Sequence, residues 1–234
     1  YEISLGLVGS EMCIRDSQMT KRKIFFRADA GVRIGYGHFI RTLALADMLR
    51  DDFDCTFFTQ SPSEYQQRET EKVCSLVALP SDNSKFEKFL DCLKGEEIVV
   101  LDNYFYTSEY QKQIKEKGCK LVCIDDMHDK HYYADVVINH GLTDGRLFDV
   151  EPYTRLCLGL DYALLRKPFI QASSTAKNPN SWFISFGGTD YFNLTEKALQ
   201  AIHDVPCVES ITVVIGDAYK YKDNLKTVSY THLT

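Results

Sequence analysis

The stretch KIFFRADAGVRIGYGHFIRTLALADMLR, residues 23–50, contains the pattern that decides the fold. Residues 23–27 form a β run with three apolar residues at its centre, typical of a strand. The apolar side chains of residues 38–50 recur at helical spacing, at Ile40, Leu43, Ala44 and Met48. A loop with three glycines joins the two segments. A strand, a glycine loop and a helix in this order predict the first unit of an α/β fold.

The same alternation continues along the chain. Further strands are predicted at residues 55–59, 75–79, 98–101, 120–124 and 136–138. Helices are predicted between them at residues 62–72, 84–93 and 108–117, the first opened by Ser61-Pro62. Because apolar strands alternate with short helices, we expect a parallel, doubly wound sheet of Rossmann-like type.

A polar connector divides the chain into two predicted domains. Residues 166–180 contain Lys-Pro, Ser-Ser-Thr and Asn-Pro-Asn, which favour turns. After it the alternation restarts with a strand at 182–186, a helix at 195–203 and a strand at 211–215. We therefore expect an N-terminal Rossmann-like domain at 19–165, a linker at 166–180 and an incomplete second Rossmann-like domain at 181–226.

The two ends of the chain resemble read-through of a sequencing adaptor. Residues 1–18 have no periodicity that would let them pack on the first strand and helix, and Met19 with its basic neighbours is typical of a natural start. Residues 227–234 resemble the matching adaptor at the other end. We expect both to be non-native tails and the gene fragment to be interrupted near Lys226; a genuine disordered tail is the alternative.

Composition excludes several classes of function. The 234 residues are 44% hydrophobic and 26% charged with a formal net charge of −6, so nucleic-acid and anionic-lipid surfaces are disfavoured. No apolar run is long enough to span a membrane, and the N-terminal residues lack the basic region of a signal peptide. The eight cysteines form no CxxC and are expected to be free thiols. These observations predict a cytoplasmic protein, and we expect a monomer.

The strongest candidate site comes directly after the first strand. Glycines at 31, 35 and 37 allow a ligand to approach the backbone, and the helix that begins near His38 offers unpaired N–H groups suited to an anion. The pattern is not GxGxxG, so NAD is disfavoured. The helix start should keep the His38 imidazole neutral and able to accept a proton from water. A capping histidine without chemistry is the alternative, but the glycines and Arg27, Arg33 and Arg41 favour function.

Other candidate polar positions come either after predicted strands, where open α/β sheets bind ligands, or just before the connector. They are Asn103 and Tyr104, Asp125 with Asp126, Tyr162 and Arg166 before the connector, and the turn of Gly187, Gly188, Thr189 and Asp190. A polar turn or helix cap would give the same pattern at each. Asp125 and Asp126 with His128 and His131 could suggest a metal, but adjacent carboxylates point apart and the segment is typical of a solvated loop. We expect no metal and no cofactor.

These motifs together resemble a known family. FRADAGVRIGYGHFIRTLALA, LDNY, IDD, LGLDYALLR and SFGGTD, in this order and spacing, are similar to UDP-2,4-diacetamido-2,4,6-trideoxy-β-L-altropyranose hydrolase of pseudaminic acid biosynthesis. The likeness covers residues 19–226, and the RADAG…GYGH…R block is its most specific part. It implies a glycosyltransferase-B architecture, in which two Rossmann-like domains hold the UDP-sugar, and an inverting hydrolysis that releases UDP.

The resemblance also implies roles for individual residues. His38 matches the catalytic base that deprotonates water, and Tyr104 matches a tyrosine that positions a group or relays a proton beside it. Gly35, Gly37 and Arg41 would line the sugar side, and Gly187, Gly188 and Thr189 the diphosphate side. The full set of expected substrate-binding residues is Arg27, Asp29, Gly35, Tyr36, Gly37, Arg41, Asn103, Asp125, Tyr162, Arg166, Gly187, Gly188, Thr189 and Asp190.

Two alternatives to hydrolysis stay open. One is a sugar transferase of the same fold, similar to the N-acetylglucosaminyltransferase that makes lipid II, whose membrane-bound acceptor usually requires an exposed apolar patch ringed by basic residues. No such patch is recognisable in the sequence. The other is a nucleotide-sugar-binding fragment without turnover, because the resemblance places much of the nucleotide site beyond Lys226. We expect the 234-residue chain to be weakly active or inactive.

Overall fold

The computed structural model describes residues 21–31, 34–172, 177–202, 205–216 and 219–228. The predicted tail at 1–18, most of the tail at 227–234, and Arg33 lie outside these residues. The chain divides into two compact units, one of Tyr1–Ala28 with Thr42–Leu164 and one of Asp29–Arg41 with Leu165–Thr234.

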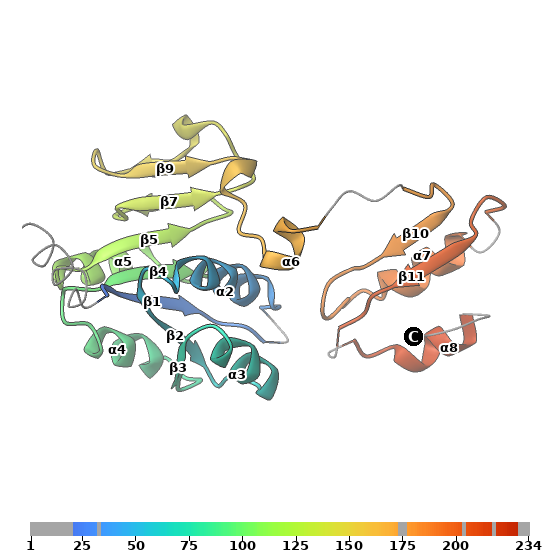
Figure 1. The fold of residues 1–234 in the computed structure, drawn as a ribbon, viewed down its shortest axis with the longest axis horizontal. Helices are drawn as coiled ribbons and strands as arrows, with labels where there is room; N and C mark the ends of the chain where they lie inside the picture. Colours follow the sequence, from blue (N-terminus) through green and yellow to red (C-terminus); the bar gives the residue numbers. More distant parts are fainter. Residues whose placement is uncertain (1–20, 32–33, 173–176, 203–204, 217–218, 229–234) are drawn as a thin grey trace, which may run out of the picture. The chain divides into compact units, whose positions relative to one another are not determined.

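A parallel sheet of seven strands forms the first unit (Figure 1). Its strands lie in the order β3-β2-β1-β4-β5-β7-β9, and every pairing between them is parallel. The strands are β1 (Lys23–Ala28), β2 (Asp54–Gln60), β3 (Ser75–Leu79), β4 (Ile98–Asp102), β5 (Lys120–Ile124), β7 (Val136–Asn139) and β9 (Arg155–Leu158). The predicted α/β class and parallel sheet are therefore confirmed, while β9 was not predicted.

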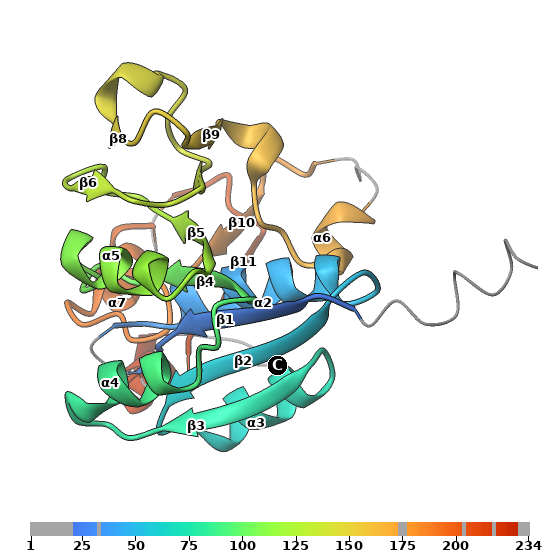
Figure 2. The same cartoon turned by 90° about the vertical axis from the view of Figure 1, so that its left-hand side faces the viewer.

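Helices connect successive strands and cover the sheet. They are α2 (Gly37–Leu49), α3 (Glu64–Glu71), α4 (Ser84–Asp91) and α5 (Ser108–Glu116). The chain steps outward from β1 to β3 and then returns to β4, so right-handed crossovers place α2 and α3 on one face and α4 and α5 on the other. Figure 2 shows α4 and α5 together on one side of the strands. The central strands are consequently buried on both faces, as in β4, where only Ile98 is partly exposed.

The core lies between the sheet and the pair α4–α5. Phe58, Phe89, Leu101, Ile114 and Leu121 are among its buried members, and all are at most 3% exposed. Aromatic rings fill the space between the two helices: Phe86 meets Tyr110 edge-on at 5.4 Å between centroids. The Tyr110 hydroxyl also donates to the Phe86 carbonyl at 3.1 Å, which fixes α5 against α4.

Helix α3 begins later than the sequence predicted. Ser63, not Ser61 or Pro62, is its N-cap, since the Ser63 hydroxyl accepts from the Gln66 N–H while the Gln66 side chain accepts from the Ser63 N–H. This reciprocal capping box satisfies two backbone donors and sets the first turn. Ser61 instead adopts a positive φ of 34° just after β2.

Shorter elements complete the first unit. A two-stranded parallel pair, β6 (His131–Tyr132) and β8 (Asp149–Val150), lies outside the main sheet, and the 3₁₀ turns η1 (Gly145–Leu147) and η2 (Leu160–Tyr162) flank β8 and β9. His131 Nδ1 contacts Asp149 at 2.9 Å and Nε2 contacts Glu151 at 3.2 Å. These two carboxylates, Asp149 first, raise the pKa of His131 against the opposing effect of burial.

The second unit contains a small parallel β-α-β arrangement. Strands β10 (Ser181–Ile184) and β11 (Ser210–Val213) pair in parallel and are joined by α7 (Leu194–Ile202), with α8 (Lys222–Val228) after them. A single-turn helix, α6 (Lys167–Ile170), lies inside the stretch that was predicted as a polar connector with turns. Residues 183 and 212 share one face of the strand pair, and Phe183 is 68% exposed there.

Candidate functional site

The carboxyl edge of the main sheet contains a topological switch point between β1 and β4. The chain leaves β1 toward β2 on one side, and β4 occupies the other side. Ala28 and Asp102 are paired in register, so the two strands end side by side and their loops start together. Open α/β sheets bind ligands at such a point. The strongest sequence motif comes directly after β1 at this edge.

The glycine loop after β1 is closed by its own backbone. The Gly35 N–H donates to the Gly31 carbonyl at 2.7 Å, and the Gly31 N–H returns a bond to Gly35 at 3.3 Å. Gly35 has a φ of +79°, a conformation that L side chains rarely adopt. A Cβ added at Gly31, Gly35 or Gly37 would meet no described heavy atom within 4 Å. The glycines therefore leave open space beside the backbone.

His38 is the second residue of α2 and is only 5% exposed. The Arg41 Nη2 lies 3.2 Å from His38 Nδ1. A guanidinium can only donate hydrogen bonds, so Nδ1 must present its lone pair and the neutral ring carries its proton on Nε2. This contact is compatible with the uncharged imidazole that the sequence predicted. It also gives Arg41 a partner inside the protein besides its predicted role toward the sugar.

The helix that carries His38 is fastened to β4 by a buried hydrogen bond. Thr42 lies in α2, and its hydroxyl donates to Asp102 Oδ2 at 2.8 Å. Neither residue is exposed to solvent. Asp102 was not among the predicted site residues, because its partner is 60 positions away in the sequence. The bond fixes the start of α2 against the end of β4.

Asn103 and Tyr104 come after β4 at the same edge, as predicted. Asn103 is 8% exposed, whereas Tyr104 is 56% exposed and its hydroxyl donates to Asp126 Oδ2 at 3.3 Å. Because the phenol proton points at the carboxylate, the Tyr104 oxygen can act toward a further polar group only as an acceptor. Asp126 comes from the loop after β5. The sequence named only its neighbour Asp125 as a binding residue.

Asp125 has a local structural partner. Its Oδ2 accepts the His128 N–H at 2.7 Å, and its own N–H donates to the Ile138 carbonyl at 3.0 Å. His128 adopts a positive φ of 43°, which this turn stabilises. The carboxylate therefore closes the loop after β5, and its role toward a substrate stays a prediction. No group of three or more His, Cys, Asp or Glu side chains in the described ranges is placed to hold a metal ion.

A second glycine turn follows β10. Gly187 has a φ of +78°, and Asp190, with a φ of +34°, accepts the N–H groups of Leu194 and Thr195 at 2.8 Å each. Asp190 thus caps α7, while Gly187 and Gly188 are exposed and Thr189 is half-buried. The Gly188 backbone packs so closely on Gly216 that a Cβ at Gly216 would lie 2.3 Å from the Gly188 carbonyl oxygen. Gly216 was missed by the sequence reasoning, although a glycine just after a strand was the signal.

Tyr162 and Arg166 precede α6 and are both exposed. Tyr162 ends η2, and the Arg166 guanidinium lies over the Phe169 ring at 5.3 Å from its centroid. This cation–π contact holds Arg166 against its own helix and leaves its charge at the surface. The role of Tyr162 and Arg166 in substrate binding stays a prediction.

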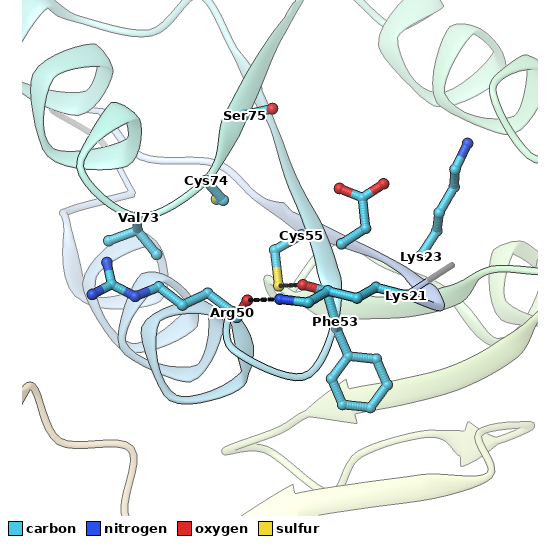
Figure 3. Close-up of a pocket in the computed structure, with 9 residues that line it drawn as sticks. Lys21, Lys23, Arg50, Phe53, Cys55, Val73, Cys74 and Ser75 are labelled. Carbon is cyan, nitrogen blue, oxygen red and sulfur yellow. Dashed lines mark hydrogen bonds between the residues drawn. The ribbon is translucent and has the colours of Figure 1, made fainter. Parts of the chain in front are cut away.

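A pocket lies at the opposite, amino edge of the sheet (Figure 3). It is lined by Lys21, Lys23, Arg50, Phe53, Asp54, Cys55, Val73, Cys74 and Ser75. Burial raises the pKa of the Cys55 thiol to about 11 and that of Cys74 to about 12. None of the predicted site residues lines this pocket. The seven described cysteines are all free thiols.

Comparison with known proteins places the chain among distant relatives. No family model matches it. It is 28% identical over 222 residues to the UDP-2,4-diacetamido-2,4,6-trideoxy-β-L-altropyranose hydrolase of Campylobacter jejuni, covering 90% of this chain and 75% of that protein. It is 30% identical over 219 residues to an uncharacterized protein of Methanocaldococcus jannaschii, covering 88% of this chain and 45% of that protein.

A third relative is the spore coat polysaccharide biosynthesis protein SpsG of Bacillus subtilis. The identity is 28% over 210 residues, which is 85% of this chain and 61% of that protein. The chain thus spans about half to three quarters of the length of these relatives. The names point to sugar-nucleotide processing at the level of a family. The hydrolase that the sequence motifs resembled is one of the relatives. In the described ranges, no helix has the length and apolar character needed to cross a membrane.

Proposed function

We propose that this chain carries the catalytic base of an enzyme that hydrolyses the anomeric bond of a UDP-linked diacetamido-trideoxy sugar, releasing UDP and the free sugar, and that the 234 residues alone are weakly active or inactive. The observation that carries the proposal is the imidazole of His38, which accepts a hydrogen bond from Arg41 and comes after the glycine loop at the β1–β4 switch point. The relation to a hydrolase named for this substrate supports the choice of sugar. The pathway that the resemblance implies is pseudaminic acid biosynthesis.

His38 acts as the general base in the proposed reaction. Water attacks the anomeric carbon while His38 accepts one of its protons, and the bond from that carbon to the diphosphate oxygen breaks with its electron pair leaving on UDP. Attack opposite to the leaving group inverts the anomeric configuration. Nδ1 holds the lone pair of the neutral ring, so the anionic diphosphate must draw Arg41 away before Nδ1 can accept the proton.

Backbone N–H groups and Arg41 stabilise the leaving diphosphate in this proposal. The loop closed at Gly35 and the exposed turn at Gly187 both leave space for an anion beside the backbone. Tyr104 presents an acceptor oxygen that can orient the attacking water. We also retain as proposals the glycosyltransferase-B architecture and the domain limits 19–165 and 181–226.

The test is UDP release from the UDP-sugar, measured with the 234-residue chain and with a longer polypeptide that contains it. His38→Ala should lower kcat by about 10²- to 10⁴-fold, the usual contribution of a general base, and leave UDP affinity nearly unchanged. His131→Ala removes an imidazole of the β6–β8 pair and serves as the matched control. Weakened UDP binding with normal turnover in His38→Ala would make the residue a binding group and would refute the proposed mechanism.

A sugar transferase is the second candidate, and one structural observation favours it. Leu165, Phe169 and Ile170 are 47–60% exposed next to Arg166 and Lys167, so apolar and basic side chains occur together where the sequence had shown no patch. An exposed apolar surface with basic neighbours suits a lipid-linked acceptor. Product analysis with water alone and with added sugar acceptors separates the two activities. Transfer that exceeds hydrolysis would replace the hydrolase proposal.

A further inference from the structure

Three cations from three separate parts of the first unit hold one short segment in the loop after β4. The segment is Tyr104-Phe105-Tyr106, in the loop after β4, here named the Tyr104 loop. Arg27 of β1, Lys85 of α4 and Lys130 of the loop after β5 each contact it. An ordinary exposed turn needs no such support, because its own backbone and water satisfy its polar groups.

Two of the cations pack on the rings of the loop. The Arg27 guanidinium, fully buried, lies 5.8 Å from the centroid of the Tyr106 ring. The Lys85 ammonium lies 4.8 Å from the Phe105 ring and 2.5 Å from the Gln60 side-chain oxygen at the end of β2. Cation–π contacts of this kind gain strength when they are desolvated. They anchor the inner side of the loop to β1 and α4.

Lys130 holds the backbone of the same loop. Its ammonium donates to the Tyr104 carbonyl at 3.3 Å and to the Tyr106 carbonyl at 3.4 Å, and it also pairs with the exposed Asp129 at 3.4 Å. The Lys130 side chain is only 17% exposed. Two carbonyls that converge on one ammonium restrict the backbone on both sides of Phe105. The direction of the Tyr104 side chain results from that restriction.

The one exposed side chain of this held segment is Tyr104. Tyr106 is 3% exposed, whereas Tyr104 is 56% exposed and donates to Asp126, which lies four residues before Lys130 in the same loop after β5. The loop after β5 therefore fixes both the backbone of Tyr104, through Lys130, and its hydroxyl, through Asp126. A rigid backbone and an aimed hydroxyl are required of a group that positions a reactant.

We propose that Lys130 is a positioning residue that acts through Tyr104: it holds the Tyr104 loop so that the phenol oxygen meets the attacking water or the sugar. The proposal rests on the proposed hydrolase function for its catalytic part, while its structural part stands on these contacts alone. Lys130 does not touch the reacting atoms. Its removal should therefore affect the chemical step more than substrate binding.

The experiment compares Lys130→Met with Lys130→Arg and with Lys112→Met. Lys112 is an exposed lysine on α5, so its replacement makes the same change in charge and length. Deuterium uptake of peptides covering residues 103–107 is measured first, in the 234-residue chain. We expect faster exchange in Lys130→Met, and exchange like that of the unmodified chain in Lys130→Arg, which keeps two donors, and in Lys112→Met.

Kinetics then test the catalytic part in whichever form of the protein releases UDP. Lys130→Met should lower kcat about 10- to 100-fold with little change in KM, and Lys130→Arg should restore most of it. In a Tyr104→Phe background the same replacement should have much less effect, because the two residues act on one step.

The outcomes separate the proposal from the function on which it rests. If deuterium exchange at residues 103–107 is unchanged in Lys130→Met, Lys130 does not hold the Tyr104 loop, and the proposal is overturned whatever the activity. A loosened loop with normal kcat, or a full additional loss in the Tyr104→Phe background, overturns the positioning role. If no form of the protein releases UDP but deuterium exchange rises in Lys130→Met as expected, the hydrolase proposal fails, while the conclusion that Lys130 holds the Tyr104 loop stands.

Discussion

Replacing Thr42 with valine isolates the bond that fastens α2 to β4. The Thr42 hydroxyl donates to Asp102 Oδ2 at 2.8 Å, and both residues are fully buried. Valine keeps the branched shape and nearly the same volume, so the main change is the loss of one donor to a buried carboxylate. Asp102 would keep its burial while losing this hydrogen bond.

The expected cost depends on the charge and the burial. Hydrogen bonds to charged groups contribute about 1.5–3 kcal/mol, and leaving a buried acceptor less satisfied places the loss toward the upper end. For a domain of this size the melting temperature should fall by roughly 5–10 °C. Urea unfolding monitored by far-ultraviolet circular dichroism measures the loss. Thr42→Ser keeps the donor and should recover most of the stability.

The Thr42→Val replacement should also slow the proposed reaction. Thr42 lies one helical turn after His38 in α2, so a looser attachment to β4 shifts the imidazole relative to the sheet. We expect kcat for UDP release to fall in Thr42→Val and to recover in Thr42→Ser. A loss of unfolding free energy below about 0.5 kcal/mol in Thr42→Val would refute the reasoning, since a buried charged bond cannot contribute so little.

Three further predictions address other parts of the chain. Gly216→Ala forces a Cβ to within 2.3 Å of the Gly188 carbonyl oxygen, so the glycine turn must move, and UDP affinity measured by calorimetry should fall about tenfold or more. The pKa of His131 is raised in the folded chain, so its contribution to the free energy of unfolding is fully present below about pH 6.5 and is lost as the pH rises through the folded pKa. His131→Gln should remove this pH dependence from the unfolding free energies measured with urea. Because burial raises the pKa of Cys55 to about 11 and that of Cys74 to about 12, a thiol reagent at about pH 8 should label both more slowly than the exposed cysteines in peptide maps.

The main sheet was predictable because its strands are local apolar runs. Strands β1 to β5 and the helices between them depend on patterns of five to thirteen residues that are visible without knowledge of partners. β9 was missed because the run Arg155–Leu158 contains no β-branched residue, unlike Val136–Asn139, and its strand identity comes from pairing with β7. β6 and β8 have two residues each and exist only through their mutual pairing, so no local pattern could indicate them.

The sequence predicted the positions of candidate residues but not the contacts that these residues make. His38 and Tyr104 were recognised from their places after strands and from the family resemblance. The hydrogen bonds that hold Tyr104 come from residues elsewhere in the chain. Asp126 accepts from its hydroxyl, and Lys130, 26 positions away, donates to its backbone carbonyl. Lys130 stands in a polar segment that the sequence presented as a solvated loop, and its burial arises only from the fold.

The distribution of cations at this edge bears on how an acidic chain can bind a diphosphate. A net charge of −6 requires positive charge to be concentrated near an anionic ligand. Yet Arg27, Lys85 and Lys130 are engaged with the Tyr104 loop, and Arg41 contacts His38. If the first three cations serve the protein itself, we expect that, among the described residues of this edge, Arg41 and the backbone N–H groups of the glycine loops meet the diphosphate. Binding that rests on N–H dipoles more than on mobile cations should weaken only modestly with added salt, whereas binding to a cluster of lysines and arginines would fall steeply. The salt dependence of UDP affinity therefore distinguishes a backbone cradle from a cationic patch.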